Sequence, residues 1–262
     1  NDPLKDNSLL EQLFALLPRK MKNVADYLLP ADADPEQIQN VIDRETDLLR
    51  MMETQMQALP SNDSKEKTLL EEWKLSITPV NDEEELRQIK RHMGHSADCF
   101  SKAFRVKNSN RDNAFWNYYD KHNYHKEDIH YWYHGSRNMN CLSILHNGLI
   151  LNPKAPKVGH MFGYGIYLAP KAKKSIGYTS LNGSFWVHGT ADKAYLFVMK
   201  TVYKSPYHVY TWTSGMKSLT KSRISPHDAV FAHAGTSLRN DEVVIFDDAQ
   251  VTLQYIIELK QQ

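Results

Sequence analysis

The chain has 262 residues, of which 41% are hydrophobic and 24% charged, values typical of a soluble globular protein. Its formal net charge of +1 excludes a global field that would draw it to nucleic acid or to an anionic membrane. Only Cys99 and Cys141 are cysteines, which excludes a disulfide framework and favours a reducing, intracellular compartment, nucleus or cytoplasm. We find neither a signal peptide nor a membrane-spanning apolar run, and therefore expect no membrane partner.

Residues 1–75 have the pattern of a short helical segment. Asp34, Pro35 and Gln37 form a helix start, with Asp34 as the N-cap, proline at the first helical position and glutamine at the third. Apolar residues then recur at helical spacing from Ile38 onward, with Glu45 as the one polar interruption. This stripe predicts an amphipathic helix that packs its apolar face in a core. Its partner is either another helix or the rest of the chain.

The remainder, residues 76–262, alternates irregularly between strands and short helices. We predict a strand near 75–79, a helix capped by Asp82 with Glu85, a strand at 100–106, a loop at 108–113 and a short helix at 114–119. Further on we predict strands at 131–133, 166–168, 195–199 and 251–259, helices at 138–146 and 170–178, and loops at 152–164 and over most of 206–240. Because regular β-α-β alternation is missing, we expect an α+β fold with two largely antiparallel sheets.

The stretch 131–178 contains groups that suit a flat amide-bearing ring. The aromatic run 131–133 predicts a strand, and Gly135 at its end permits close approach of a ligand to the backbone. Ser136 adds a hydroxyl beside that backbone, so together these groups can hold a carboxamide, which both donates and accepts hydrogen bonds. Tyr167 and Tyr178 are candidates to sandwich the ring.

Four motifs follow one another along the chain. They are H-G-S-R from His134, M-F-G-x-G-I-Y ending at Tyr167, K-S-x-x-Y from Lys174, and Glu242 opening an apolar run that leads to D-x-A-Q. From about residue 77 to 259 the chain thereby resembles the catalytic domain of the poly(ADP-ribose) polymerases, within the diphtheria-toxin-like ADP-ribosyltransferases. The signature of that family is a His, a Tyr and a Glu on three strands. His134, Tyr167 and Glu242 match these three positions.

The resemblance implies an ADP-ribosyltransferase fold that uses NAD as its donor substrate. It implies a catalytic domain at 76–262, preceded at 1–75 by a helical segment that is interpreted as a reduced regulatory domain. It also implies protein acceptors, the chain itself among them, and binding of nucleic acid only through domains outside this chain. The implied catalytic residues are Glu242, His134, Tyr167 and Lys174. The implied NAD-binding residues are His134, Gly135, Ser136, Asn140, Tyr167, Ser175 and Tyr178.

Two positions depart from the family pattern, because Ile150 stands where an arginine is usual and His160 where a tyrosine is usual. Retention of Glu242 favours elongation to poly(ADP-ribose), since an attacking hydroxyl needs a nearby base. Transfer of single units and a non-catalytic module that binds NAD or ADP-ribose remain the alternatives. We expect no metal, because His92, His95 and Cys99 lack a fourth ligand.

Overall fold

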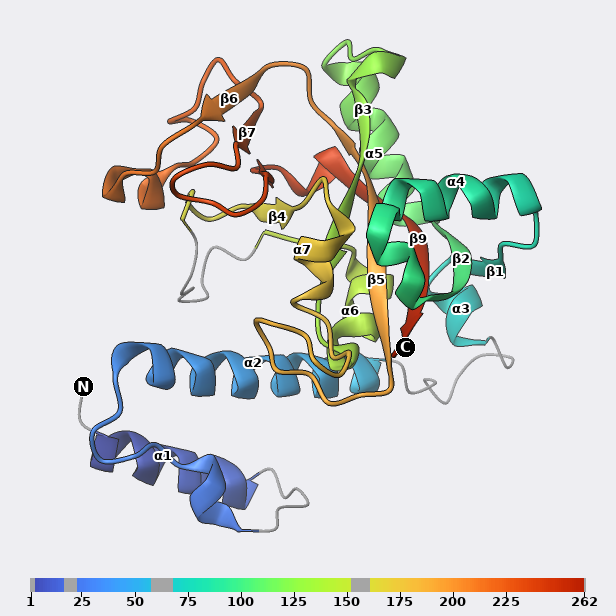
Figure 1. Ribbon diagram of the computed structural model, residues 1–262. Coiled ribbons are helices and arrows are strands. Elements are labelled where there is room, and N and C mark those ends of the chain that lie inside the picture. The colour runs from blue at the N-terminus through green and yellow to red at the C-terminus, as the bar shows by residue number, and fades with distance from the viewer. Residues whose placement is uncertain (1–2, 17–22, 58–67, 152–160, 262) are drawn as a thin grey trace.

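The computed structural model describes residues 3–16, 23–57, 68–151 and 161–261, and it has an α+β fold with two sheets (Figure 1). The five-stranded sheet has the order β1 (Leu75–Pro79), β2 (Phe100–Asn108), β9 (Val251–Lys260), β5 (Lys193–Val202) and β3 (Ile129–Gly135). The four-stranded sheet has the order β4 (Ile166–Leu168), β8 (Glu242–Ile245), β7 (Ala229–Ala232) and β6 (Pro206–Val209). Every pairing is antiparallel except β6–β7, so the predicted fold class is confirmed.

Helices pack against the five-stranded sheet and form the N-terminal segment. They are α1 (Pro3–Leu16), α2 (Pro35–Gln57), α3 (Leu69–Glu72), α4 (Glu83–Met93), α5 (Ser109–Lys121), α6 (Cys141–Asn147) and α7 (Ala172–Ile176). Short 3-10 turns connect them, namely η1 (Val24–Tyr27), η2 (Gly94–Cys99), η3 (Lys126–Asp128), η4 (Asn138–Asn140), η5 (Ser214–Ser218) and η6 (Asp248–Gln250). Within these described ranges, no helix is long and apolar enough to cross a membrane.

Side-chain caps begin two of the predicted helices. The Gln37 N–H donates to Asp34 Oδ1 at 2.8 Å, and the Asp34 N–H donates to Gln37 Oε1 at 3.0 Å. The Glu85 N–H likewise donates to Asp82 Oδ1 at 2.8 Å. Each bond satisfies an amide that the helix itself leaves without a partner. The sequence-based prediction of both helix starts is therefore confirmed.

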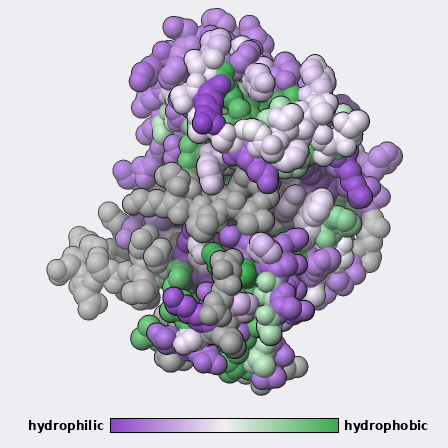
Figure 2. All heavy atoms as spheres, turned by 90° about the vertical axis from the view of Figure 1, so that its left-hand side faces the viewer, coloured by the Kyte–Doolittle hydropathy of each residue, from purple (hydrophilic) through white to green (hydrophobic). Residues whose placement is uncertain are grey.

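Helix α2 contacts the rest of the chain through polar as well as apolar side chains. It packs against α6 and η4, and Figure 1 shows it running beneath them. Glu45 is buried with its carboxylate 3.0 Å from Arg44 Nε, whereas Ile42 and Leu49 of the predicted stripe are exposed. The prediction that the stripe is core is therefore wrong for these two residues. Figure 2 shows a largely hydrophilic face, with hydrophobic residues gathered at the bottom of the view.

The range 108–113, predicted to be loop, is mostly helix, whereas the range 206–240, predicted to be mostly loop, is indeed mostly outside helices and strands. The range 108–113 contains the start of α5, where Asn108 is the N-cap and accepts from the Arg111 N–H at 3.2 Å. The range 206–240 contains β6 and β7, whose parallel pairing joins residues more than 20 positions apart. Such short strands depend on a non-local partner, which explains why periodicity did not reveal them. The predicted loop 152–164 lies mainly in 152–160, outside the described residues.

The five-stranded sheet has a hydrophobic core on each side. Leu196 and Val198 of β5 belong to the cluster that packs under α4. Phe197 and Met199, the alternate residues, belong to the cluster that also contains residues of β4 and β8. One face of this sheet is thus covered by α4, and the other packs against the four-stranded sheet.

A buried glutamine fastens the two sheets together. The Gln250 amide donates to the Val202 carbonyl at the end of β5 and to the Asp228 carbonyl before β7, both at 3.0 Å. Its side chain is 1% exposed, so water cannot replace these bonds.

We expect Gln250→Leu to lower the free energy of unfolding by about 1–3 kcal/mol, because two buried carbonyls lose their donor. Urea denaturation measures the change. The matched control is Gln88→Leu on the exposed surface of α4, which should change the value by less than about 0.5 kcal/mol. A Gln250→Leu protein as stable as this control would contradict the assignment.

Candidate functional site

The site begins at the end of β3, where successive residues face opposite sides of the sheet. Tyr133 belongs to the buried cluster under α4. His134 lies on the other side, with its Nδ1 at 3.1 Å from the Tyr167 carbonyl. Because a carbonyl can only accept, Nδ1 carries the proton and Nε2 is left as an acceptor in the neutral ring. Burial lowers the pKa of His134, and the carbonyl only partly opposes that shift.

Gly135 is required by the close approach of α7. A Cβ at this position would lie 1.7 Å from the Ser175 carbonyl oxygen. The Ser175 hydroxyl is buried and donates to the Tyr133 carbonyl at 3.0 Å, which leaves its oxygen lone pairs as acceptors. The two motifs that contain Gly135 and Ser175 therefore meet in space.

A polar chain leads from β3 to the N-terminal segment. The Asn140 amide donates to Ser136 Oγ at 2.9 Å and to Asp47 Oδ2 of α2 at 3.5 Å. Burial raises the pKa of Asp47, although Asn140, Arg50 and Arg137 oppose the shift. Sequence reasoning missed Asp47, because it is one of many polar residues on α2 and no local pattern sets it apart.

Two tyrosines lie on neighbouring parts of the site. The Tyr167 hydroxyl of β4 donates to the Gly163 carbonyl at 2.8 Å and accepts from the Phe162 N–H at 3.0 Å. Tyr178 is 38% exposed and stacks on Trp186, with ring centroids 5.8 Å apart. Burial, assisted by the Glu242 carboxylate, raises the pKa of Tyr178 to about 12. Both rings are therefore neutral and available for stacking at pH 7.

An enclosed ion pair lies beside these rings. Lys174 Nζ is 2.7 Å from Glu242 Oε1, and the two side chains are only 11% and 12% exposed. Glu242 is the first residue of β8 and pairs with Ala232 of β7, so its backbone is fixed by the ladder. Lys174 is on α7, next to Ser175. The geometry holds one carboxylate oxygen of Glu242 against an ammonium group.

Two cavities open at the site. One, of about 180 Å³, has a wall that includes His134, Ser136, Asn140 and Ile150. The other, of about 300 Å³, has a wall that includes Gly135, Ser136, Asn140, Tyr178 and Trp186. Helix α2 contributes Asn40, Asp43, Arg44, Asp47 and Arg50 to these walls.

Five of the predicted residues thus line the cavities, namely His134, Gly135, Ser136, Asn140 and Tyr178. The other four, Tyr167, Lys174, Ser175 and Glu242, adjoin them through the contacts given above. Their individual roles remain predictions. Trp186 was not predicted, and its place in a loop outside the helices and strands gave no signal.

Over the described parts of the chain, no three His, Cys, Asp or Glu side chains are placed to share a metal ion. His92 Nδ1 is instead 2.7 Å from the Tyr133 hydroxyl, and Cys99 Sγ donates to the Ser96 carbonyl at 3.0 Å. The expectation that no metal takes part stays a prediction.

Known proteins match this chain over its C-terminal two thirds. The family model for the poly(ADP-ribose) polymerase catalytic domain matches residues 83–261. Poly(ADP-ribose) polymerase 1 of Gallus gallus is 32% identical over 153 residues, which are 49% of this chain and 14% of that protein. Poly(ADP-ribose) polymerase of Drosophila melanogaster is 31% identical over 147 residues, which are 49% of this chain and 15% of that protein. Poly(ADP-ribose) polymerase 2 of Arabidopsis thaliana is 26% identical over 219 residues, 70% of this chain and 33% of that protein.

The lowered pKa of His134 leads to a prediction about stability and pH. An unfolded histidine, with a pKa of about 6.5, takes up a proton at a higher pH than His134 does in the fold. The free energy of unfolding should therefore fall as pH drops from 7.5 to 5.5, at a slope of at most about 1.4 kcal/mol per pH unit for this one proton. In His134→Gln, which cannot take up that proton, the fall should be smaller.

Urea denaturation at several pH values provides the measurement. Burial also lowers the pKa of His92, His130 and His146, but these remain in both proteins, so the difference isolates His134. Identical pH slopes in the two proteins would show that His134 is not held neutral.

Proposed function

The chain belongs to the poly(ADP-ribose) polymerase catalytic-domain family, whose members are NAD⁺ ADP-ribosyltransferases, and on that premise we propose that it extends the first ADP-ribose into a polymer. The observation that carries this proposal is the enclosed Lys174–Glu242 pair beside Tyr178. The proposed acceptors are proteins, with the chain itself among them.

The nicotinamide end of NAD binds in the cavity lined by Gly135 and Tyr178. The main-chain groups of Gly135, with the Ser136 and Ser175 hydroxyls, hold the carboxamide. This assignment is supported by the place of Gly135 and Ser136 in the wall of this cavity and by the acceptor lone pairs of Ser175. Tyr178 stacks on one face of the ring and Tyr167 covers the other.

The adenosine ribose lies toward the cavity of about 180 Å³ that His134 lines. His134 accepts from a ribose hydroxyl through Nε2, because Nδ1 is already committed to the Tyr167 carbonyl. Asn140 contributes beside it, supported by its place in the walls of both cavities.

In the reaction, the bond from ribose C1′ to the nicotinamide nitrogen breaks, and nicotinamide leaves with the bonding electrons. Positive charge builds up on the ribose, where the Glu242 carboxylate binds the 2′-hydroxyl and strengthens that contact as the charge develops. An acceptor hydroxyl then forms a new bond to C1′ and gives up its proton, for which Glu242 serves as the base. Lys174 holds that carboxylate in position, with its Nζ 2.7 Å from Glu242 Oε1.

We expect Glu242→Gln, which keeps the shape but removes the charge, to slow elongation by roughly 100-fold or more. Attachment of the first unit to a carboxylate acceptor should fall less, because a carboxylate has no proton to lose. The assay follows label from NAD into protein bands and chain length on a gel. Glu258→Gln is the matched control, because Glu258 is also an enclosed ion-pair partner, 3.5 Å from Lys193, but lies at the far end of β9.

Single-unit products from the wild-type chain, or polymer at the wild-type rate from Glu242→Gln, would refute elongation through Glu242. NAD binding without nicotinamide release would instead indicate a module that only reads the nucleotide. Label that stays on free ADP-ribose would indicate hydrolysis.

The proposed role of residues 1–75 is regulatory. Helix α2 places charged side chains in the walls of both cavities, and its Asp47 contacts Asn140 directly. Asp47 thus competes with a ribose for the hydrogen bond of the Asn140 amide. In this arrangement α2 restricts entry of the whole dinucleotide until it moves.

We expect a chain that begins at Thr68 to have a KM for NAD lower by about five-fold or more, the lower end of couplings between sites. Asp47→Ala in the full chain should shift KM in the same direction but less, because it removes one contact and leaves the helix. Circular dichroism of each protein checks folding. If KM is the same in all three proteins, α2 does not restrict the site.

A further inference from the structure

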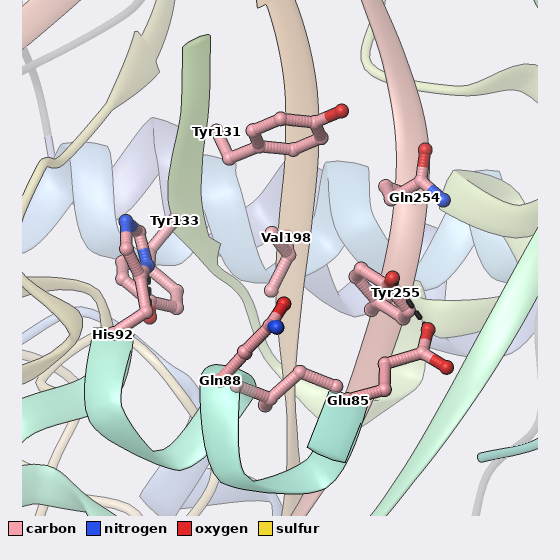
Figure 3. Close-up of a pocket in the computed structure, with 9 residues that line it drawn as sticks. Glu85, Gln88, His92, Tyr131, Tyr133, Val198, Gln254 and Tyr255 are labelled. Carbon is pink, nitrogen blue, oxygen red and sulfur yellow. Dashed lines mark hydrogen bonds between the residues drawn. The ribbon is translucent and has the colours of Figure 1, made fainter. Parts of the chain in front are cut away.

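A third pocket lies on the other face of the five-stranded sheet, away from the two cavities beside His134 and Gly135. Its volume is about 340 Å³, and it lies as an open hollow between α4 and strands β3, β5 and β9 (Figure 3). Helix α4 contributes Glu85, Gln88, Ile89 and His92, at the spacing that places side chains along one helical face. The volume is in the range typical of small-molecule sites. No step of the proposed transfer reaction uses this pocket.

Hydrogen bonds fix the pocket at both ends. His92 Nδ1 is 2.7 Å from the Tyr133 hydroxyl at one end, and the Tyr255 hydroxyl donates to Glu85 Oε1 at 2.6 Å at the other. Between them, the short side chain of Val198 forms the floor (Figure 3). The helix is therefore held to the sheet at two points, and the space between them does not depend on a flexible loop.

A bulge in β9 supplies an extra wall. The β5–β9 pairing passes from Val198↔Tyr255 directly to Met199↔Leu253, which leaves Gln254 without a partner on β5. Adjacent strand residues ordinarily face opposite sides, yet Gln254 and Tyr255 both line this pocket. Bulges re-aim side chains in this way, and they are common beside binding sites.

The polar groups of the pocket are almost uncharged. Burial lowers the pKa of His92 and raises that of Tyr255 to about 12, so both are neutral at pH 7. The one ionised group is Glu85, whose pKa is lowered chiefly by its hydrogen bonds from Arg105 and whose charge is compensated by that arginine. The lining residues include neither lysine nor arginine, so the pocket offers no partner for a phosphate.

Two polar groups and two rings remain for a ligand. Within the described residues, no protein group hydrogen-bonds the Gln254 amide or the Tyr131 hydroxyl, and both line the pocket. Figure 3 shows them together at the top of the view, with the ring of Tyr131 above Val198 and that of Tyr255 below Gln254. An amide that both donates and accepts, between aromatic rings, is complementary to a flat heterocycle with an adjacent donor and acceptor.

We propose that this pocket is a second ligand site, which takes an uncharged nucleobase of the adenine type. A glutamine amide pairs in two-point fashion with the N6 and N7 edge of adenine, and Gln254 presents that amide. Tyr131 and Tyr255 supply the stacking surfaces that a base requires. The proposal does not rest on the proposed transferase function, because it concerns binding on the opposite face of the sheet.

Titration calorimetry of the full chain with adenosine tests the proposal. Gln254→Leu should weaken adenosine binding by about ten-fold or more through loss of the paired edge, and Tyr131→Ala, at a partly exposed position, should weaken it through loss of stacking. Inosine, which lacks the N6 amino group, should bind the wild-type chain correspondingly less tightly. ADP-ribose, titrated into His134→Ala so that the NAD cavity contributes less, separates the two sources of adenine. Affinity equal to that of adenosine indicates a nucleotide carrier, and weaker affinity indicates a free nucleoside.

The NAD cavities provide the counter-control. His134→Ala and Asn140→Leu remove adenosine contacts in the NAD cavities alone, so the site that depends on Gln254 should keep its adenosine affinity in both variants, whereas Gln254→Leu should leave transfer of label from NAD unchanged. Adenosine binding that is lost in the first two variants and kept in Gln254→Leu would overturn the proposal. So would equal affinities for adenosine and inosine, or no binding of adenosine to the wild-type chain.

Discussion

The contact of β3 with α7 and the end of β4 is the constraint on which the site depends. Tyr133 and Ala169 exchange two backbone hydrogen bonds of 2.9 Å, which link the two sheets. Two residues further along β3, the backbone of Gly135 approaches the Ser175 carbonyl too closely for any side chain. Because β4 also pairs with β8, this link fixes where Glu242 lies relative to His134. Motifs more than 100 residues apart are thereby brought to one place.

The electrostatics of the site follow from its enclosure. Removing an ion pair such as Lys174–Glu242 from water is costly, and the pair seldom stabilises a fold more than apolar residues of similar size would. Its presence is therefore better explained by chemistry than by stability. The same enclosure keeps His134 neutral and Tyr178 protonated, so the groups around the pair interact with a ligand as dipoles and rings.

Local chemistry and the order of motifs made much of the structure predictable. The caps at Asp34 and Asp82 depend on neighbours three residues away, and both were found from sequence. The strand positions of His134, Tyr167 and Glu242 followed from the motifs that contain them. The strands β6 and β7 were missed because a non-local parallel partner defines them. Asp47 was missed for a similar reason: its contact with Asn140 joins residues 93 positions apart.

The bulge at Gln254 has a consequence for how the length of this chain can vary. A one-residue deletion within a central strand ordinarily turns every side chain beyond it to the wrong face of the sheet. Gln254 differs from such a residue because it has no partner on β5. Without it, the pairs Leu253↔Met199 and Tyr255↔Val198 would be consecutive in the ladder. Loss of Gln254 would restore a regular ladder and leave the buried residues of β9 where they are. A single-residue gap at this point is therefore compatible with an intact fold, and it would remove the wall of the α4 pocket while leaving the face that carries His134 unchanged.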